Sequence, residues 1–242
     1  MNNSVVISSI IRLDNNGNIK FPNVLERLFQ LEYPEELKDY FFIMSPEHSR
    51  VTEKIERLKS IAQNRKRIIK AFLGIRPKKD YLLFVDDDQL PPKDIIYRLI
   101  ELNGDISAPR TNPKNKPELP KTSFNFMRNA DFSKVEPSPD YPIQQEIKEI
   151  DGKKIIIRWI YFEPPLKIAD KIYWTDVVGM FCTLIKRKVL ETIVMRYEEG
   201  NIVRTGDGQS FDLSEDGLFC LRAIQNKFKV KELNLKIEHL NG

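Results

Sequence analysis

The feature that most constrains this chain is residues 79–92, where an apolar run stops at three consecutive aspartates. Tyr81 to Val85 is continuously apolar, which is typical of a central strand buried on both faces of a parallel sheet. Asp86, Asp87 and Asp88 follow it directly. Adjacent carboxylates at the end of a core strand repel one another and lose hydration, so a positive group is needed to stabilise them. A divalent cation is the simplest such group.

The position of the acids agrees with this interpretation, because ligands of open α/β sheets bind outside the carboxyl ends of the strands. The alternative is structural: the aspartates form a turn before Pro91 and Pro92, and one of them caps a helix that begins near Lys93. A turn and a cap explain one carboxylate. Three carboxylates after a run of core residues favour a metal and phosphate site.

The first part of the chain alternates predicted strands with predicted helices. The further strands are expected at residues 5–11, 40–44 and 105–109, and the helices at residues 22–31, 51–73 and 93–102. This order predicts right-handed crossovers and a mainly parallel sheet with helices on both faces.

The second part of the chain is less regular. Residues 111–142 are rich in proline and are expected to form a long loop, whereas residues 155–162 have strand character and are expected to pair with residues 146–150. Residues 174–190 read as a strand that leads into a helix. Gly179 within it would either let the backbone pass close to a bound ligand or mark a bulge in an ordinary strand. Residues 198–213 read as a connection, residues 214–224 as a helix, and residues 228–239 as a last strand.

Composition favours one globular domain. The 242 residues are 41% hydrophobic and 31% charged, and no apolar run is long enough to cross a bilayer. Residues 1–4 lack the basic start of a signal peptide, so we expect a cytoplasmic protein in which Cys182 and Cys220 are buried thiols.

The net charge of +4 is too balanced to favour nucleic acid as a partner. Basic clusters occur at residues 65–67, 76–79 and 186–188. They are interpreted either as solvated helix faces or as surfaces that attract nucleotide phosphates or a membrane of anionic lipid.

Three segments resemble one known family. The strand followed by Asp86-Asp87-Asp88 resembles the DXD motif of nucleotide-sugar glycosyltransferases of the GT-A fold, in particular the family-2-like group. Residues 174–190 resemble a second block of that family, and Glu215-Asp216 at the start of a helix resembles its Glu-Asp motif. His239 matches a histidine that follows this helix. The similar segments lie in family order and span residues 5–239.

The resemblance implies a fold and an activity. The fold would be α/β, a GT-A three-layer α/β/α sandwich with a mostly parallel central sheet, formed by a single domain over residues 1–242. Residues 1–110 would be the nucleotide-binding half, residues 111–172 an insertion and connecting region, and residues 173–242 the acceptor and catalytic half. The enzyme would move a sugar from a nucleotide-diphosphate donor to a hydroxyl of a glycan, a lipid-linked or a protein acceptor, with inversion.

The resemblance also implies roles for individual residues. Asp86, Asp88 and His239 would hold a divalent cation, with Mn²⁺ favoured over Mg²⁺ because carboxylates and imidazole suit it. Asp216 would be the general base and Glu215 would hold an acceptor hydroxyl. Residues 198–213 would close over bound donor. The residues implied in donor and nucleotide binding are Ser8, Arg12, Asn64, Arg65, Asp86 and Asp87, together with Asp14.

Two alternatives stay open. A protein of the same fold could bind nucleotide sugars without catalysing transfer, and a sugar nucleotidyltransferase shares the fold but has a glycine-rich loop after the first strand, which residues 8–16 lack. Acids in the first turn of a helix also suit its dipole, so Glu215 and Asp216 could simply stabilise the helix. The second strand ends in Ser45-Pro46-Glu47-His48 instead of the family's acid, which leaves the nucleotide base open.

Overall fold

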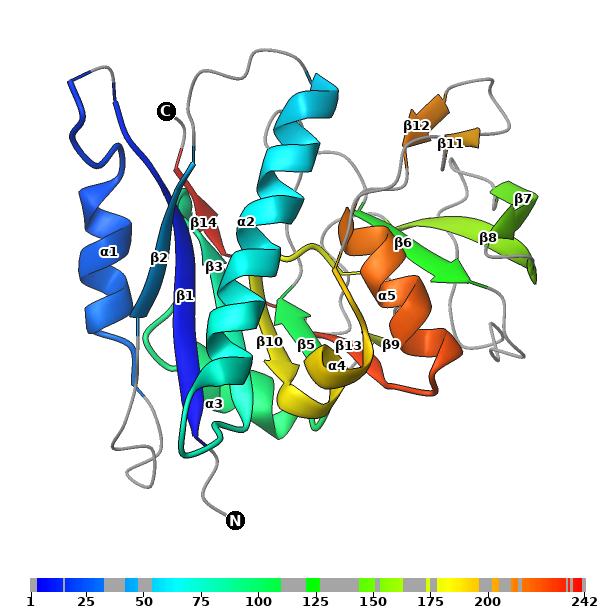
Figure 1. Ribbon diagram of the computed structural model, residues 1–242. Helices are drawn as coiled ribbons and strands as arrows, with labels where there is room; N and C mark the ends of the chain where they lie inside the picture. The colour runs from blue at the N-terminus through cyan, green and yellow to red at the C-terminus, as the bar shows by residue number, and fades with distance from the viewer. Residues whose placement is uncertain are drawn as a thin grey trace.

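The computed structural model describes residues 4–14, 16–32, 42–47, 54–109, 121–126, 144–150, 153–162, 173–174, 178–195, 202–204, 210–212, 215–233, 235 and 237–240. Its main element is a seven-stranded sheet in the order β2-β1-β3-β10-β5-β13-β9 (Figure 1). The strands are β1 (Val5–Arg12), β2 (Phe42–Glu47), β3 (Tyr81–Asp86), β5 (Ile106–Pro109), β9 (Tyr173–Trp174), β10 (Cys182–Lys186) and β13 (Val230–Leu233).

The sheet is mixed, with most strands parallel. β2, β1 and β3 run parallel to one another, and β13 runs parallel to β5. β10 lies antiparallel between β3 and β5, and β9 is antiparallel to β13 at one edge. The α/β class and the mostly parallel sheet predicted from the sequence are therefore confirmed.

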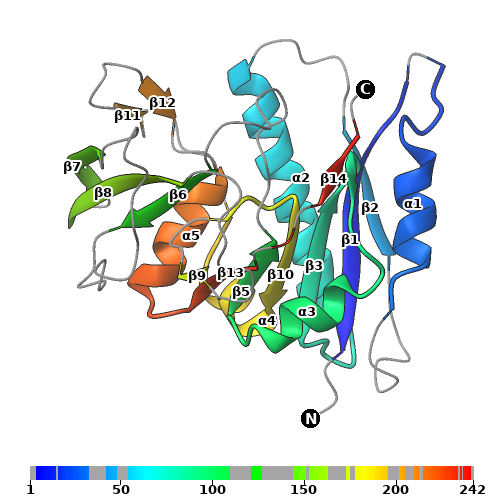
Figure 2. The same ribbon diagram turned by 180° about the vertical axis from the view of Figure 1, so that it is seen from behind.

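Helices cover both faces of this sheet, as Figures 1 and 2 show from opposite sides. On one face, α2 (Lys54–Gly74), α4 (Arg187–Thr192) and α5 (Glu215–Gln225) contribute to a core that includes Leu82 and Phe84 of β3. On the other face, α1 (Pro22–Phe29) and α3 (Ile95–Glu101) pack with Leu83 and Val85. β3 is thus buried on both faces, as its continuous apolar sequence predicts.

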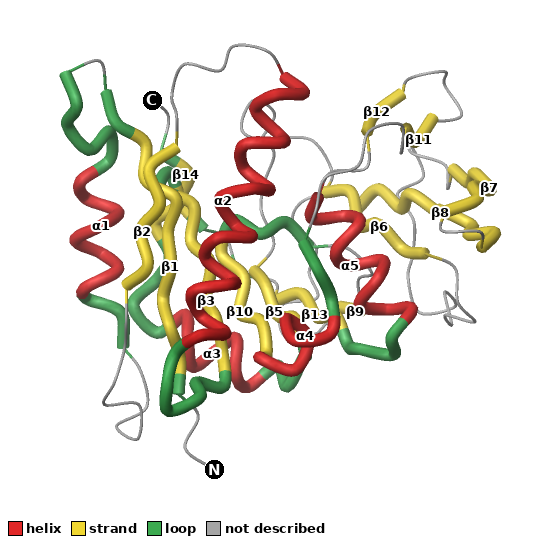
Figure 3. Tube along the Cα trace, in the orientation of Figure 1, coloured by secondary structure: helices red, strands yellow, loops and turns green. Residues whose placement is uncertain are grey.

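Three small sheets complete the described part of the chain. β6 (Lys121–Phe126), β8 (Lys153–Phe162) and β7 (Gln144–Ile150) form an antiparallel sheet, and β11 (Ile202–Arg204) pairs with β12 (Ser210–Asp212). Both lie beyond α5 at one side of the molecule (Figure 3). β14 (Glu238–His239) pairs with β4 (Gln89–Leu90), which brings the end of the chain to the carboxyl end of β3.

Four sequence predictions need correction. The proline-rich segment contains strand β6, and residues 198–213 contain the β11–β12 pair, because pairing with a partner strand organises residues that lack a strong periodicity of their own. Residues 228–239 form two strands in different sheets, not one. β2 begins and ends later than predicted and includes Pro46, which an edge strand tolerates.

Other predictions hold. β7 and β8 form the expected hairpin, and Cys182 and Cys220 are free and buried. Among the helices in the described ranges, none has the length and apolar character needed to cross a membrane.

Candidate functional site

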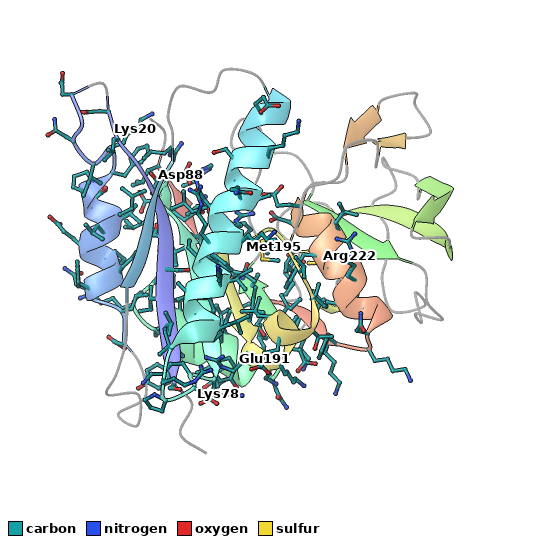
Figure 4. All side chains as sticks on the ribbon, in the orientation of Figure 1. Lys20, Lys78, Asp88, Glu191, Met195 and Arg222 are labelled. Atoms are coloured by element: carbon teal, nitrogen blue, oxygen red, sulfur yellow. The ribbon has the colours of Figure 1, made fainter. Side chains whose placement is uncertain are left out.

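The acid triplet, defined as Asp86, Asp87 and Asp88, lies where β3 ends. It borders a solvent-open pocket, which is also lined by Arg12, Arg65, Ile10 and Ile61. Figure 4 places Asp88 near the upper ends of the central strands and Lys78 and Glu191 near their lower ends. The pocket is therefore at the carboxyl end of β3, where ligands of α/β sheets bind.

Arg12, the last residue of β1, binds two members of the triplet. Its backbone N–H donates to Asp87 Oδ2 at 2.7 Å, and its Nε donates to Asp87 Oδ1 at 2.8 Å. Its Nη2 donates to Asp88 Oδ2 at 2.7 Å. β1 and β3 are neighbouring parallel strands with Ile10 opposite Asp86, so their carboxyl ends place these groups side by side. The two carboxylates keep the pKa of Arg12 above its usual value although burial opposes this.

His239 reaches the same carboxylate from β14. Its Nε2 lies 3.3 Å from Asp88 Oδ2, and its strand partner in β4 is Gln89, next in sequence to Asp88. Gln89 Nε2 is 3.4 Å from the other oxygen of Asp88. The predicted proximity of Asp88 and His239 is therefore present, across about 150 residues of sequence.

Arg65 joins the triplet to the second acidic motif. This α2 side chain is 4% exposed, and its Nη2 lies 3.4 Å from Asp86 Oδ1. Its Nη1 donates to Glu215 Oε1 at 2.8 Å and makes a short contact with Asp216 Oδ1. The three carboxylates raise the pKa of Arg65 against the opposing effect of burial. One guanidinium thus connects acids from β3 and from α5.

Glu215 and Asp216 differ in their surroundings. Glu215 is 3% exposed, and burial followed by the charge of Asp216 raises its pKa to about 7. The side chain of Asp216 is 19% exposed, and its Oδ2 accepts the backbone N–H of Met180 at 3.1 Å. Asp216 therefore has a route to solvent and a fixed orientation. Glu215 faces Arg65 in this conformation, not an open surface.

The backbone around Gly179 supports this arrangement. A Cβ at position 179 would lie 2.7 Å from the ring of Phe181 and 3.9 Å from Asp216 Oδ2. The carbonyl of Phe181 accepts the backbone N–H of Asp86 at 2.7 Å. Phe181 is thus the side chain that leaves least room at Gly179, and the predicted approach of a ligand to this backbone stays a prediction. The contacts of Met180 and Phe181 were not predicted, because backbone groups leave no signal in the sequence.

Other predicted site residues lie apart from this cluster. Ser8 is buried within β1, where its hydroxyl donates to the Leu83 carbonyl. Asn64 is buried on α2, with its Oδ1 3.4 Å from Arg67 Nη1. Asp14 accepts the backbone N–H groups of Asn16 and Asn18 in an exposed turn. The structure brings together Arg12, Arg65, Asp86, Asp87, Asp88, Glu215, Asp216 and His239.

The charges of this cluster do not balance. Five carboxylates face two guanidinium groups and one imidazole. Burial raises the pKa of Asp86 to about 6; Arg65 opposes this rise and the carboxylates of Asp216, Asp88 and Asp87 add to it. The Asp86 side chain is 37% exposed. An added cation would be stabilised by this excess of negative charge.

Asp88 and His239 are the residues of this cluster that could together hold a divalent ion. No group of three or more His, Cys, Asp or Glu side chains in the described ranges has an arrangement that would hold a metal. However, Asp88 Oδ2 and His239 Nε2 are 3.3 Å apart, close to the separation of about 3 Å expected for adjacent ligands with bonds of about 2.1 Å. Ions bound with phosphates use one or two carboxylates and complete their coordination with phosphate and water oxygens. The pair fits a cation shared with a phosphate ligand.

Comparisons with known proteins add little. No known family model matches the chain, and no curated protein is detectably similar to it. Among solved structures, A197 from STIV is similar with a TM-score of 0.45 and 14% identity, covering 99% of this chain and 86% of that one. A likeness this distant carries no information on function.

Proposed function

We propose that this protein is a metal-dependent glycosyltransferase of the GT-A type, which moves a sugar from a nucleotide-diphosphate donor to an acceptor hydroxyl. The observation that carries the proposal is the position of the acid triplet, which lines one pocket at the carboxyl end of the central strand together with Arg12 and Arg65. His239 contacts Asp88 and Asp216 contacts Arg65, so both lie next to residues of this lining. These are the groups that the sequence resemblance assigns to the donor and to the base, and they come from segments far apart in the chain.

The donor is proposed to bind at the acid triplet. Asp88 and His239, with Asp86 beside them, would hold a divalent ion, Mn²⁺ in preference to Mg²⁺, that offsets negative charge on the leaving diphosphate. Arg12 and Arg65 line the same pocket and supply the remaining positive charge next to the phosphates. Ile10 and Ile61 give the pocket an apolar wall for the donor.

Asp216 is proposed as the general base. Its carboxylate would take the proton of the acceptor hydroxyl as that oxygen bonds to the anomeric carbon, while the bond to the diphosphate oxygen breaks and its electron pair leaves with the diphosphate. The Met180 N–H and Arg65 hold the Asp216 carboxylate in one orientation. Glu215 would act through Arg65, because its buried Oε1 accepts from the same nitrogen that contacts Asp216.

The test is a calorimetric screen of nucleoside diphosphates and their sugars, with and without Mn²⁺. We expect a nucleoside diphosphate to bind only with the ion present and Asp88→Ala to lose that binding. The matched control is Asp94→Ala, which removes a carboxylate paired with Arg98 on α3. Equal donor binding by Asp88→Ala and wild type would show that the metal is held elsewhere. Binding without turnover in any acceptor mixture would instead indicate a nucleotide-sugar-binding protein.

A further inference from the structure

We infer that Arg12 is a displaceable counter-cation: it occupies the cation position at Asp88 in the ligand-free protein, and a divalent ion binds only when Arg12 releases that carboxylate. This inference rests on the proposed function, because it concerns the ion that would accompany the donor. It makes Arg12 an inhibitor of metal binding, opposite to the effect expected of an ordinary residue of the binding site.

The first reason is that Arg12 and the ion need the same atom. Arg12 Nη2 donates to Asp88 Oδ2 at 2.7 Å, and His239 Nε2 approaches this oxygen to 3.3 Å. Asp88 Oδ2 and His239 Nε2 are the two donor atoms that fit adjacent positions around an ion. A guanidinium in hydrogen-bond contact with one of them places its positive charge where the ion would be repelled.

The second reason is that Arg12 cannot leave by losing its proton. A guanidinium stays protonated at any pH at which a protein is folded. Competition with a cation must therefore be resolved by movement of the guanidinium.

The third reason is that such a movement costs little. Asp87 accepts the backbone N–H and the Nε of Arg12, so these two bonds can persist while Nη2 turns away from Asp88. The side chain is 17% exposed and borders the open pocket, and its guanidinium lies 5.1 Å from the centre of the Phe21 ring, which supports it from the side. After release, Nη2 would face the pocket where a diphosphate binds.

The test measures the affinity for Mn²⁺ alone, by the paramagnetic resonance of the free ion and by calorimetry. Replacing Arg12 alone would leave buried Asp87 without its partner and change the net charge. We therefore use the pair Arg12→Met with Asp87→Asn, which removes one charge of each sign. The reference proteins are wild type and Asp87→Asn. A second variant, Arg12→Lys, keeps the positive charge but lacks the fork that reaches two carboxylates at once.

We expect the Arg12→Met, Asp87→Asn protein to bind Mn²⁺ about tenfold more tightly than wild type, which corresponds to about 1.4 kcal/mol. Arg12→Lys should show a smaller gain. Adding Asp88→Asn should abolish the gain, because the competition takes place at that carboxylate.

Each contrary result has a distinct meaning. If wild type binds Mn²⁺ and the Arg12 variants bind it equally or less tightly, Arg12 does not compete and the inference is wrong, whereas the proposed metal site stands. If the gain persists with Asp88→Asn, the competition does not involve Asp88, and the inference is also wrong. If no variant binds Mn²⁺, the inference fails together with the metal site, and donor binding without Mn²⁺ then decides whether the proposed transfer survives.

Discussion

At the scale of single residues, the guanidinium of Arg65 holds three carboxylates that would otherwise repel one another. It is nearly fully buried, and it contacts Asp86 from one acidic motif and Glu215 and Asp216 from the other. Removing one partner of a buried ion pair leaves the other charges uncompensated, which costs about 3–5 kcal/mol. Arg65 is therefore important for stability whether or not it also touches a donor phosphate, and loss of activity in an Arg65 variant would not by itself identify a binding role.

A substitution of Asp216 can separate an effect on catalysis from an effect on the fold. Asp216→Asn keeps an oxygen that can accept the Met180 N–H and removes the proposed base. We expect transfer to fall by about 10²-fold or more, a typical contribution of a general base. Donor affinity should change little, because Asp216 contacts Arg65 and the Met180 N–H, and not Asp88 or His239. Initial rates and calorimetry with the donor found by the screen measure the two effects.

The control for this prediction is Asp80→Asn, which removes an exposed carboxylate that binds Ser4 at the amino end of β3. It should leave both rate and donor affinity unchanged. A loss of donor binding as large as the loss of turnover in Asp216→Asn would mean that Asp216 holds the metal or the fold. With no change in either quantity, the base would have to be another residue, and Glu215 would be the first to test.

At the scale of elements, helix α2 carries Arg65 in its middle and is fixed at its C-terminal end by Arg187. The guanidinium of Arg187 donates to the carbonyls of Phe72, Leu73 and Lys79, and it stacks on the Phe72 ring at 4.4 Å. The last carbonyls of a helix have no partner within the helix, and a positive charge suits the negative end of its dipole. Arg187 thus anchors the helix that positions Arg65.

Replacing Arg187 by Met tests this anchor. The apolar stem remains, but the buried carbonyls of Phe72 and Lys79 lose a charged donor, so we expect the free energy of unfolding to fall by about 2–4 kcal/mol. Urea denaturation provides the measurement. Lys78→Met is the control, since Lys78 is exposed and only 3.7 Å from its partner Glu191, and it should change stability by less than about 0.5 kcal/mol. A similar small effect in both variants would contradict the anchoring role.

The pair β11–β12 is expected to be the least stable described element. It is a two-stranded sheet separate from the seven-stranded one, and such pairs are marginal in water without further packing. We expect its amides to exchange rapidly in the free protein and more slowly when nucleoside diphosphate and Mn²⁺ bind, as a closing element would. Amides of β3 should be protected in both states. Equal exchange of β11–β12 with and without ligand would exclude closure.

Periodicity explains which elements could be predicted. β1, β3 and α2 have strong patterns of their own, and their predicted positions agree with the structure within a few residues. β6, β11 and β12 lack such patterns and depend on partner strands, so the sequence favoured loops there. The split of the last segment into β13 and β14 depends on pairing with β5 and β4, which a local pattern does not report.

The candidate site was predictable to a similar degree. The acid triplet, Asp216 and His239 were identified from residue type and order, and the structure brings Asp88 to His239. The partners of the acids were not predicted, because the contacts of Arg12 and Arg65 depend on which strand ends and helix faces meet. The sequence alone therefore predicts a divalent cation beside the three carboxylates. In the structure, Arg12 and Arg65 already supply part of the positive charge that these carboxylates require.

At the scale of the whole molecule, the site lies where the two halves of the chain meet. Asp86 from the first half donates its N–H to Phe181 in the second half, and Arg65 from the first half contacts Asp216 in the second. The backbone N–H of Met180, the residue before Phe181, donates to Asp216 Oδ2. These contacts form a ring that links the end of β3, residues 180–181 and the start of α5. Protonation of its acids should therefore affect the stability of the complete fold.

The raised pKa of Glu215 determines the direction in which stability changes with pH. Its pKa is raised from 4.5 to about 7, first by burial and then by Asp216, so between these pH values the folded protein binds more protons than the unfolded chain. The free energy of unfolding must then fall as the pH rises from about 4.5 to about 7, and Asp86, whose pKa is also raised, acts in the same direction. Asp14 and Asp105 have lowered pKa values, and their opposite effect belongs to more acidic solutions.

Urea denaturation at a series of pH values tests this prediction. We expect the free energy of unfolding of the wild type to fall by on the order of 1 kcal/mol or more across this pH range, because one unit of pKa shift corresponds to about 1.4 kcal/mol. Glu215→Gln should flatten the dependence, since glutamine does not titrate. Glu56→Gln, which removes an exposed carboxylate of α2, should leave it unchanged. If Glu215→Gln keeps the full pH dependence of the wild type, another acid of this ring takes up the proton. Asp86→Asn would then have to remove the pH dependence.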